Sequence, residues 1–270
     1  MAKIKMVVTD IDGTLVDGRK RVPKENIEAI AEAKARGILV CASTTRNWPS
    51  ARSILREAGI DDESVLCNGA VLFDVKKEEV LEKWTIPSIY VDPLLQIAIK
   101  YGPANVWTSR GMISWRESMP RWARENRAQS RPRSDHFFVV ESYDDWVEAA
   151  QVDCNIIFVW TDHENHIPLY AEMCGVGNFL LSAADEDHVY IMAHNATKGH
   201  AVSQLAARYG IAPDEVMAVG DSKNDASMLR WAGLGVAMGN GNQLAKDTAD
   251  VITGTNVDGG LSQAIRKWVL

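Results

Sequence analysis

The chain has 270 residues, which suits one large domain or two modest ones. Hydrophobic residues make up 46% and charged residues 24%, so a substantial core is available without disulfides. The net charge of -7 argues against a nucleic-acid-binding protein, which would present a basic face. No apolar run approaches the roughly 18 residues of a membrane span, and no cysteines have zinc or C-x-x-C spacing. We therefore expect a cytoplasmic protein with free thiols and no membrane or nucleic-acid partner.

Short apolar runs alternate with helical segments in the first third of the chain. The pattern predicts strands at 4–9, 38–42 and 65–67, and helices at 23–36 and 50–58. Pro23 suits the first turn of a helix, and Gly37 suits the position just after its end. An alternation of strands and helices of this kind predicts a parallel sheet with helices on both faces.

The last third repeats this style, whereas the middle differs. We expect helices at 198–209, 224–231 and 260–268, and strands at 216–219 and 234–237. Between about 83 and 188 the pattern is less regular, with a helix at 89–100, a strand at 155–160 and six of the nine tryptophans. The sequence thus predicts an α/β fold: a Rossmann-like parallel-sheet core of residues 1–83 and 188–270, interrupted by an inserted α+β domain at 84–187.

The strongest chemical signal is Asp10-Ile11-Asp12-Gly13-Thr14-Leu15, directly after the first predicted strand. Ligands of open parallel sheets bind beyond the carboxyl ends of the strands, so both carboxylates would face that crevice. Two like charges held close need a cation or a proton between them. Asp and Gly are also common in ordinary turns, but turn chemistry alone explains this combination poorly.

A second acidic motif, Gly220-Asp221-Ser222-Lys223-Asn224-Asp225, follows another apolar strand. Taken alone it would suit a helix cap and turn. Together with the first motif it places four carboxylates at one sheet edge, and such a group needs a hard divalent cation. Because all the candidate ligands are oxygens, Mg²⁺ fits better than zinc.

Two weaker signals complete the set. Ser43-Thr44-Thr45-Arg46 follows the second predicted strand and offers hydroxyl and backbone N–H groups suited to phosphate oxygens. On its own it would more simply be a helix cap. Lys198 begins a predicted helix, and a lysine there is usually solvated; it gains weight because a phosphoryl site needs a cation besides the metal.

In this order the four motifs resemble those of the haloacid dehalogenase superfamily of phosphatases, whose large type 2 cap is inserted between the second and third motifs. The stretch Val236-Ala237-Met238-Gly239-Asn240-Gly241, with Asp250, Asp258 and Asn68-Gly69-Ala70, is similar to the Cof-type branch with its type 2B cap. The resemblance implies Mg²⁺-dependent hydrolysis of a sugar phosphate or related small phosphate ester, with the cap selecting the substrate.

The resemblance also implies a role for each motif residue. Asp10 would be the nucleophile and a Mg²⁺ ligand. Asp12 would be the general acid and base and would offer its backbone carbonyl to the metal. Thr44 and Lys198 would hold the phosphoryl oxygens. The remaining residues of the set are Asp221, a further metal ligand, and Asn224 and Asp225, which would support the metal, the phosphate or Lys198.

Some features stay open at this level. The family usually has Gly where this chain has Thr45, which puts its substrate scope in question. Arg46 and His194 lie near the motifs without an assigned role. The arginine- and tryptophan-rich segment 110–133 suits an anion- or sugar-binding surface, but we favour a solvated helix face. His163 and His166 lack a further metal ligand nearby. Nothing in the sequence requires more than one copy, and a monomer and a dimer are both compatible with it.

Three competing functions are weighed against hydrolysis. A phosphomutase of the phosphomannomutase type shares this scaffold and cap, and also forms an aspartyl phosphate. A receiver domain combines clustered acids with a Thr or Ser and a Lys, but it is about half this length and lacks D-x-D-G-T. A degenerate relative that only binds phosphates is disfavoured because no core acid is missing.

Overall fold

The computed structural model describes residues 3–121, 136–182 and 187–270, which divide into two compact units. Unit 1 comprises the described residues up to Arg46, Ser50–Glu82 and Thr197–Leu270. Unit 2 comprises Asn47–Pro49 and the described part of Lys83–Ala196. Residues 122–133 of the arginine-rich segment lie outside the described residues, so the expected helix face is not tested there. In the described part that expectation is wrong: Gly111–Trp115 form a strand and Arg116–Ser118 a short 3-10 turn, because the chain there pairs with neighbouring strands instead of closing helical hydrogen bonds.

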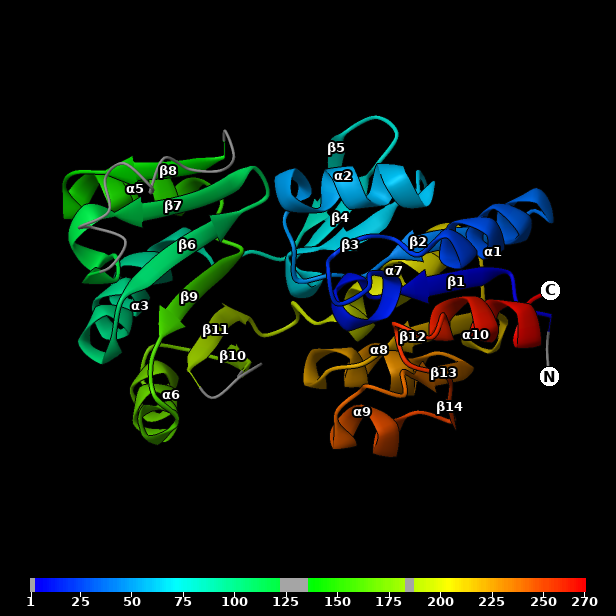
Figure 1. Ribbon diagram of the computed structural model, residues 1–270. Helices are drawn as coiled ribbons and strands as arrows, with labels where there is room; N and C mark the ends of the chain where they lie inside the picture. Colours follow the sequence, from blue (N-terminus) through cyan, green and yellow to red (C-terminus); the bar gives the residue numbers. More distant parts are fainter. Residues whose placement is uncertain (1–2, 122–135, 183–186) are drawn as a thin grey trace. The chain divides into compact units, whose positions relative to one another are not determined.

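Unit 1 is built on a five-stranded sheet in which every neighbouring pair is parallel. The strand order places the first strand of the chain between strands from its two halves (Figure 1). In sheet order the strands are β14 (Val251–Ile252), β13 (Leu234–Ala237), β12 (Val216–Gly220), β1 (Met6–Thr9) and β2 (Leu39–Ala42). β1, β12 and β13 are buried throughout, as expected for strands covered on both faces.

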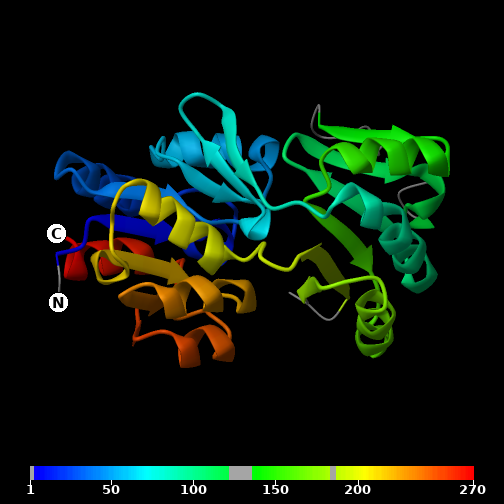
Figure 2. The ribbon, with the colours of Figure 1, turned by 180° about the vertical axis from the view of Figure 1, so that it is seen from behind.

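Helices cover both faces of this sheet. α1 packs against α10, in front in Figure 1, and α7 packs against α8, in front in Figure 2. The helices of unit 1 are α1 (Lys24–Ala35), α2 (Trp48–Ala58, which belongs to unit 1 from Ser50 onward), α7 (Lys198–Arg208), α8 (Ala226–Trp231), α9 (Gln243–Thr248) and α10 (Gly260–Trp268). α1 ends as predicted before Gly37, whose φ of 78° lies in the left-handed region that glycine tolerates. The predicted α/β class with a parallel-sheet core is thereby confirmed.

The third predicted strand does not extend the parallel sheet. β3 (Ser64–Leu66) pairs antiparallel with β4 (Val71–Asp74), and β5 (Glu79–Lys83) completes a separate three-stranded sheet. An isolated parallel β-bridge pairs Val65 of β3 with Ser43, the residue that follows β2. The cause lies in Cys67-Asn68-Gly69, which all have positive φ and turn the chain back on itself.

Unit 2 contains a six-stranded sheet that is antiparallel except for its last pair, β7 and β8. In sheet order its strands are β10 (Phe179–Ser182), β11 (His188–Ala193), β9 (Ile156–Trp160), β6 (Ala104–Thr108), β7 (Gly111–Trp115) and β8 (Phe137–Val140). This sheet with its helices is the α+β architecture expected of the insert.

Among the described residues of unit 2, three helices pack on its sheet and form a hydrophobic core with it: α3 (Ser88–Tyr101), α5 (Tyr143–Val152) and α6 (His166–Cys174). Buried side chains such as Leu94 and Trp146 meet Val106, Ile157 and Val159 from the strands. Because side chains alternate along a strand, residues such as Asn105, Trp107 and Phe158 belong to the opposite face.

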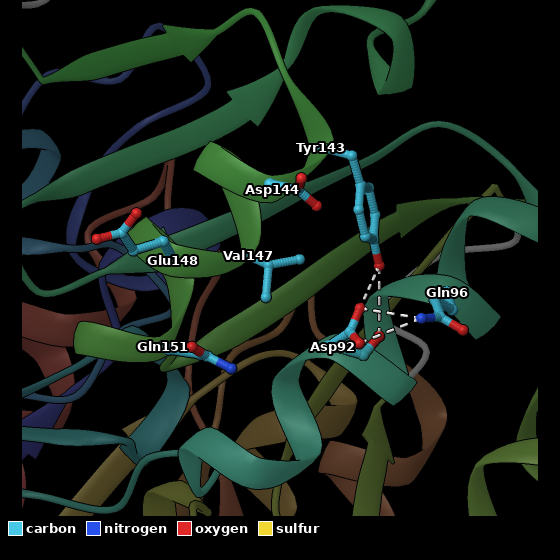
Figure 3. A pocket seen from close by; sticks show the side chains of 7 residues that line it. All are labelled: Asp92, Gln96, Tyr143, Asp144, Val147, Glu148 and Gln151. Atoms are coloured by element: carbon cyan, nitrogen blue, oxygen red, sulfur yellow. Dashed lines mark hydrogen bonds between the residues drawn. The ribbon is translucent and has the colours of Figure 1, made fainter.

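A polar groove lies between α3 and α5 (Figure 3). The Tyr143 hydroxyl donates to Asp92 Oδ1 at 2.7 Å, and Gln96 Nε2 donates to the same carboxylate at 3.1 Å. These bonds satisfy the carboxylate within the groove, so the cluster connects the two helices. Among the described residues, no helix is long and apolar enough to cross a membrane.

Candidate active site

The site is built at the carboxyl ends of β1 and β12, two adjacent strands of unit 1. Their register pairs Thr9 with Val219, so the residues that follow leave the sheet side by side. The backbone N–H of Asp10 donates to Val219 O at 2.9 Å, which extends this pairing to the first acidic residue. Asp221 follows directly after Gly220, the last residue of β12. Segments more than 200 positions apart in sequence therefore place their carboxylates at one sheet edge.

Lys198 is the centre of a buried ion-pair cluster. Its Nζ donates to Asp10 Oδ1 at 2.7 Å and to Asp225 Oδ1 at 2.5 Å. The side chains of Lys198 and Asp225 are fully buried, and that of Asp10 is 7% exposed. Thr197 caps the N-terminus of α7 by accepting from the His200 N–H, which fixes the first turn from which Lys198 projects.

Asp225 also holds the loop that carries the second acidic motif. Its Oδ2 accepts from the backbone N–H groups of Asp221 and Ser222, each at 2.9 Å, and from the Ser222 hydroxyl at 3.0 Å. Both oxygens of Asp225 are thus engaged by protein groups. Its geometry suits a residue that orients Lys198 and the 220–225 loop.

Three carboxylates, those of Asp10, Asp221 and Asp225, each offer an oxygen within 4.8 Å of the others. Lys198 contributes one positive charge to this cluster, so two negative charges are uncompensated when all three carboxylates are ionised. Burial, together with the charges of the neighbouring aspartates, raises the pKa of Asp10 well above its usual range and that of Asp221 to about 6, against the opposing charge of Lys198. Burial would lower the pKa of Lys198, but Asp10 and Asp225 outweigh it and raise that pKa.

Gly13 lets the first acidic loop approach Asp221 closely. Its φ is 84°, and a Cβ at this position would collide with the Asp221 carboxylate. The next residue, Thr14, donates its hydroxyl to Asp221 Oδ1 at 3.3 Å. Asn240, from the Cof-like stretch, donates to the Gly13 carbonyl at 2.9 Å. The glycine of the D-x-D-G-T motif is therefore needed for this packing.

Asp12 is paired with Arg46 rather than with the buried cluster. Arg46 donates from Nε to Asp12 Oδ2 and from Nη2 to Oδ1, both at 2.7 Å, and from Nη1 to the Ser50 carbonyl at 2.9 Å. Burial would raise the pKa of Asp12, but the hydrogen bonds and charge of Arg46 outweigh it and lower that pKa. The side chain of Asp12 is 48% exposed, so it stays open to solvent. The sequence left Arg46 without a role, and this bidentate pair supplies one.

Thr44 lies two residues after the end of β2 and is 1% exposed. Its backbone N–H donates to Val65 O, and its hydroxyl accepts from the Arg46 N–H at 3.2 Å. The neighbouring Thr45 hydroxyl accepts from Asn224 Nδ2 at 2.9 Å, and the same amide donates to Asn68 Oδ1 at 3.0 Å. Asn224 thus connects three loops. This contact was not predicted from the sequence, where the unusual Thr45 was taken as bearing on substrate scope alone.

Other candidate residues lie elsewhere. His194 is exposed in unit 2, as is His163, whose ring centroid lies 5.2 Å from that of His166. In the part of the chain that the structure describes, the group formed by Asp10, Asp221 and Asp225 is the one set of three or more potential metal ligands, so the histidine pair lacks a third partner. The side chain of Asp12 is outside this set.

A buried lysine among aspartates at the end of a parallel sheet is typical of a phosphoryl-transfer enzyme. A family model described as haloacid dehalogenase-like hydrolase matches residues 7–265. The chain belongs to this family and is a phosphatase of the haloacid dehalogenase type, as the motifs predict.

Two relatives match almost the whole chain. It is 28% identical to the 5-amino-6-(5-phospho-D-ribitylamino)uracil phosphatase YcsE of Bacillus subtilis, over 99% of this chain and 96% of the relative. It is 26% identical to the pyridoxal phosphate phosphatase YbhA of Escherichia coli, over 97% of each.

Solved structures agree with the fold. A haloacid dehalogenase-like hydrolase from B. subtilis superposes with a TM-score of 0.83 and 27% identity, covering 98% of this chain and 99% of the other. The subclass IIB sugar phosphatase BT4131 gives a TM-score of 0.79 and 26% identity, covering 97% of this chain and 98% of the other.

Proposed function

We propose that the protein hydrolyses a small phosphate monoester, with Mg²⁺ as cofactor and with a phosphoryl group carried transiently on Asp10. The observation that carries the proposal is the convergence of Asp10, Asp221 and Asp225 around the buried ammonium of Lys198. A nucleophilic carboxylate, a fixed cation and carboxylates able to hold a divalent metal ion are what such a displacement requires.

The donor set fits a hard divalent cation. All candidate ligand atoms are oxygens, and the two negative charges left by Lys198 match the charge of Mg²⁺. Asp10 and Asp221, together with the backbone carbonyl of Asp12, would hold the ion. Asp225 completes the acidic group, but because its oxygens are engaged elsewhere, we assign it to orienting Lys198. When bound, the ion would neutralise the phosphoryl oxygens and position them against Asp10.

Asp10 attacks phosphorus, and the bond between phosphorus and the ester oxygen breaks. Asp12, in its protonated form, gives its proton to the leaving oxygen, so the alcohol departs neutral. The Asp12 carboxylate then takes a proton from the water that attacks the phosphoryl group on Asp10. Inorganic phosphate leaves, Asp10 is restored as a carboxylate, and Asp12 is again protonated. The Lys198 ammonium offsets the negative charge on the phosphoryl oxygens, and the Thr44 hydroxyl donates a hydrogen bond to them.

We assign Asn224 to the phosphate side of the site, where it acts by holding the loops that carry Thr44 and Asn68. The inserted domain, 84–187, is proposed as the cap that selects the substrate. Relatives named for a phosphoribitylamino-uracil, for pyridoxal phosphate and for a sugar phosphate support a small metabolite ester as the substrate. A cytoplasmic location is part of the proposal, as is activity without a nucleic-acid partner.

The test is Asp10→Asn, compared with the unchanged chain on a panel of phosphate monoesters with Mg²⁺ and with chelator. We expect phosphate release by the unchanged chain, its loss with chelator, and its loss in Asp10→Asn, because the amide cannot attack phosphorus. Acid quenching during turnover, followed by mass spectrometry of peptides, should find one phosphoryl group on Asp10. Full activity of Asp10→Asn with a native unfolding temperature would refute the mechanism.

The same assay separates hydrolysis from a mutase reaction. A phosphomutase would depend on added sugar bisphosphate and would return an isomeric sugar phosphate, not inorganic phosphate. We expect stoichiometric phosphate release without any bisphosphate.

A further inference from the structure

The face of the unit 2 sheet that lies opposite its helices carries an aromatic cavity. The cavity measures about 220 Å³ and is lined mainly by Trp107, Met112, Phe137, Phe158 and Trp160, from four of the strands. The helix-covered core uses the alternate residues of the same strands, among them Val106, Ile157 and Val159. The alternation along three adjacent strands therefore builds two apolar faces where one would suffice for a stable sheet.

The rings are arranged in a way that suits a flat ligand. Trp107 and Phe158 are parallel to within 4°, with ring centroids 5.7 Å apart, and Trp160 meets Phe158 edge-on at 4.5 Å. Parallel aromatic planes favour stacking with another planar ring. This volume is larger than that of a dry protein cavity that holds benzene, about 150 Å³. It is smaller than that of a pocket for a whole ligand, about 300 Å³ or more. It fits a single substituted ring, one part of a larger molecule.

Two polar atoms beside this cavity lack partners among the described residues. Asn105, which lines the cavity, is 4% exposed, and its Oδ1 accepts no hydrogen bond there. The indole Nε1 of Trp107 is buried and has no acceptor in the same part of the chain. A buried polar atom without a partner is costly and calls for an explanation. A ring that carries both a hydrogen-bond donor and an acceptor would satisfy Asn105 and Trp107 together.

We propose that this cavity binds a planar heteroaromatic ring with donor and acceptor groups, carried by the alcohol part of the substrate. The inference rests on the proposed function for its catalytic meaning, whereas binding of the ring depends on unit 2 residues alone. It narrows the substrate from any small phosphate ester to one whose leaving group contains such a ring. Trp107, Phe158 and Asn105 are then specificity-determining residues.

The kinetic test uses the full chain with Mg²⁺ and two sets of esters. Pyridoxal phosphate, uridine 5′-phosphate and riboflavin 5′-phosphate carry a ring; glycerol 3-phosphate, ribitol 5-phosphate and glucose 6-phosphate carry none that is planar. We expect kcat/KM at least ten-fold higher for one or more of the first set. Trp107→Leu should raise KM for that ester on the order of ten-fold, the effect of losing one stacked ring, and leave the second set unchanged.

The polar half is tested with Asn105→Leu, which keeps the shape and removes the acceptor. We expect it to lose discrimination between the preferred ring ester and benzyl phosphate, whose ring lacks donor and acceptor groups. Phe138→Leu is the matched control, because Phe138 lies on β8, is 52% exposed and does not line the cavity. Equal effects of Trp107→Leu on both sets of esters, or none on either, would overturn the inference.

A failure of the proposed function is distinguishable. If the unchanged chain hydrolyses no ester, the proposed hydrolytic function is wrong. Binding of the ring is then measured directly with pyridoxine, uridine and riboflavin, which lack phosphate. Ligand-detected NMR on the full chain should then show binding of at least one ring compound, lost in Trp107→Leu and kept in Phe138→Leu. Cyclohexanol, which has no planar ring, serves as the non-binding control. If the three ring compounds bind the unchanged chain no better than cyclohexanol does, the ring site is wrong.

Discussion

At the scale of single residues, the pairing of Asp12 with Arg46 creates a tension with the role proposed for Asp12. A general acid must hold a proton, yet the guanidinium lowers the pKa of this carboxyl and favours its charged form. Delivery of the proton therefore requires that substrate or phosphate draw Arg46 away from Asp12. The pair would keep the acid ionised until an anionic ester arrives.

Replacing Arg46 with Met should raise the pKa of Asp12. Burial, which already acts to raise it, would then be opposed only by the more distant lysines. The change is measured by NMR titration of ¹³C-labelled aspartate carboxyls in the metal-free protein, with Asp12→Asn to assign the signal. In the unchanged chain the Asp12 carboxyl should titrate at lower pH than in Arg46→Met. Identical titrations would show that the bidentate pair does not persist in solution.

Position 13 is a second place where the surrounding structure restricts which residue can be accommodated. Gly13→Ala should destabilise the fold by about 1–3 kcal/mol through its left-handed φ, and should displace the Asp221 carboxylate. We expect Mg²⁺ affinity, measured by calorimetry, to fall at least ten-fold. Gly18→Ala is the matched control, since nothing lies within 4 Å of a Cβ there. Unchanged Mg²⁺ binding by Gly13→Ala would argue against Asp221 as a ligand.

At the scale of elements, the loops after β2, β3 and β12 are connected through the Asn224 amide. Thr45, where the family usually has Gly, supplies one of its acceptors. Thr45→Gly should therefore cost about 0.5–1.5 kcal/mol for the lost hydrogen bond, plus the added backbone entropy of glycine. Chemical denaturation measures the change. Thr45→Ser keeps the hydroxyl and should remain close to the unchanged chain; an equal loss in both variants would locate the effect in the methyl group.

Several elements were predictable from local signals, and others were not. The predicted strand at 234–237 and helix at 260–268 coincide with β13 and α10, because their apolar patterns end at clear turn residues. The strand at 65–67 was assigned to the wrong sheet: only the left-handed turn at Cys67-Asn68-Gly69 sends it back to β4, and two non-glycine residues gave no sign of it. The strand order of unit 2 depends on pairings between distant segments, which no local pattern encodes.

The candidate site was likewise predictable only in part. The acidic motifs were visible because they follow apolar strands, and the structure brings Asp10, Asp221, Asp225 and Lys198 together. Side-chain partners were not visible: the Asp12–Arg46 pair and the connection of Thr45 to Asn224 and Asn68 form across segments that only the fold brings close. The catalytic roles of these residues stay predictions.

At the scale of the whole molecule, the uncompensated charge of the acidic cluster predicts a stability that depends on both Mg²⁺ and pH. The pKa of Asp221 is raised to about 6. Without metal, the folded state holds this proton more tightly than the unfolded chain does, so ionisation destabilises the fold as pH rises from about 4 through about 6. The proposed Mg²⁺ would bind the ionised form and should relieve this cost.

We therefore expect Mg²⁺ to raise the unfolding temperature more at pH 7.5 than at pH 5. At a concentration one hundred times the dissociation constant, the stabilisation would be about 2.7 kcal/mol, a shift on the order of 5 °C. Scanning calorimetry with Mg²⁺ or chelator at each pH gives the measurement, and Asp221→Asn serves as the variant without this titration. An equal shift at both pH values would contradict the raised pKa.

The register of β1 against β12 has a consequence for how the protein can change over generations. Asp10, Asp221, Asp225 and Lys198 all belong to unit 1, on two stretches of chain that flank Lys83–Ala196. Amino-acid replacements, insertions or deletions inside that stretch leave the hydrogen bonds between Thr9 and Val219 and their neighbours untouched. Lineages can thus replace the intervening hundred or so residues while inheriting the acidic cluster and Lys198 intact.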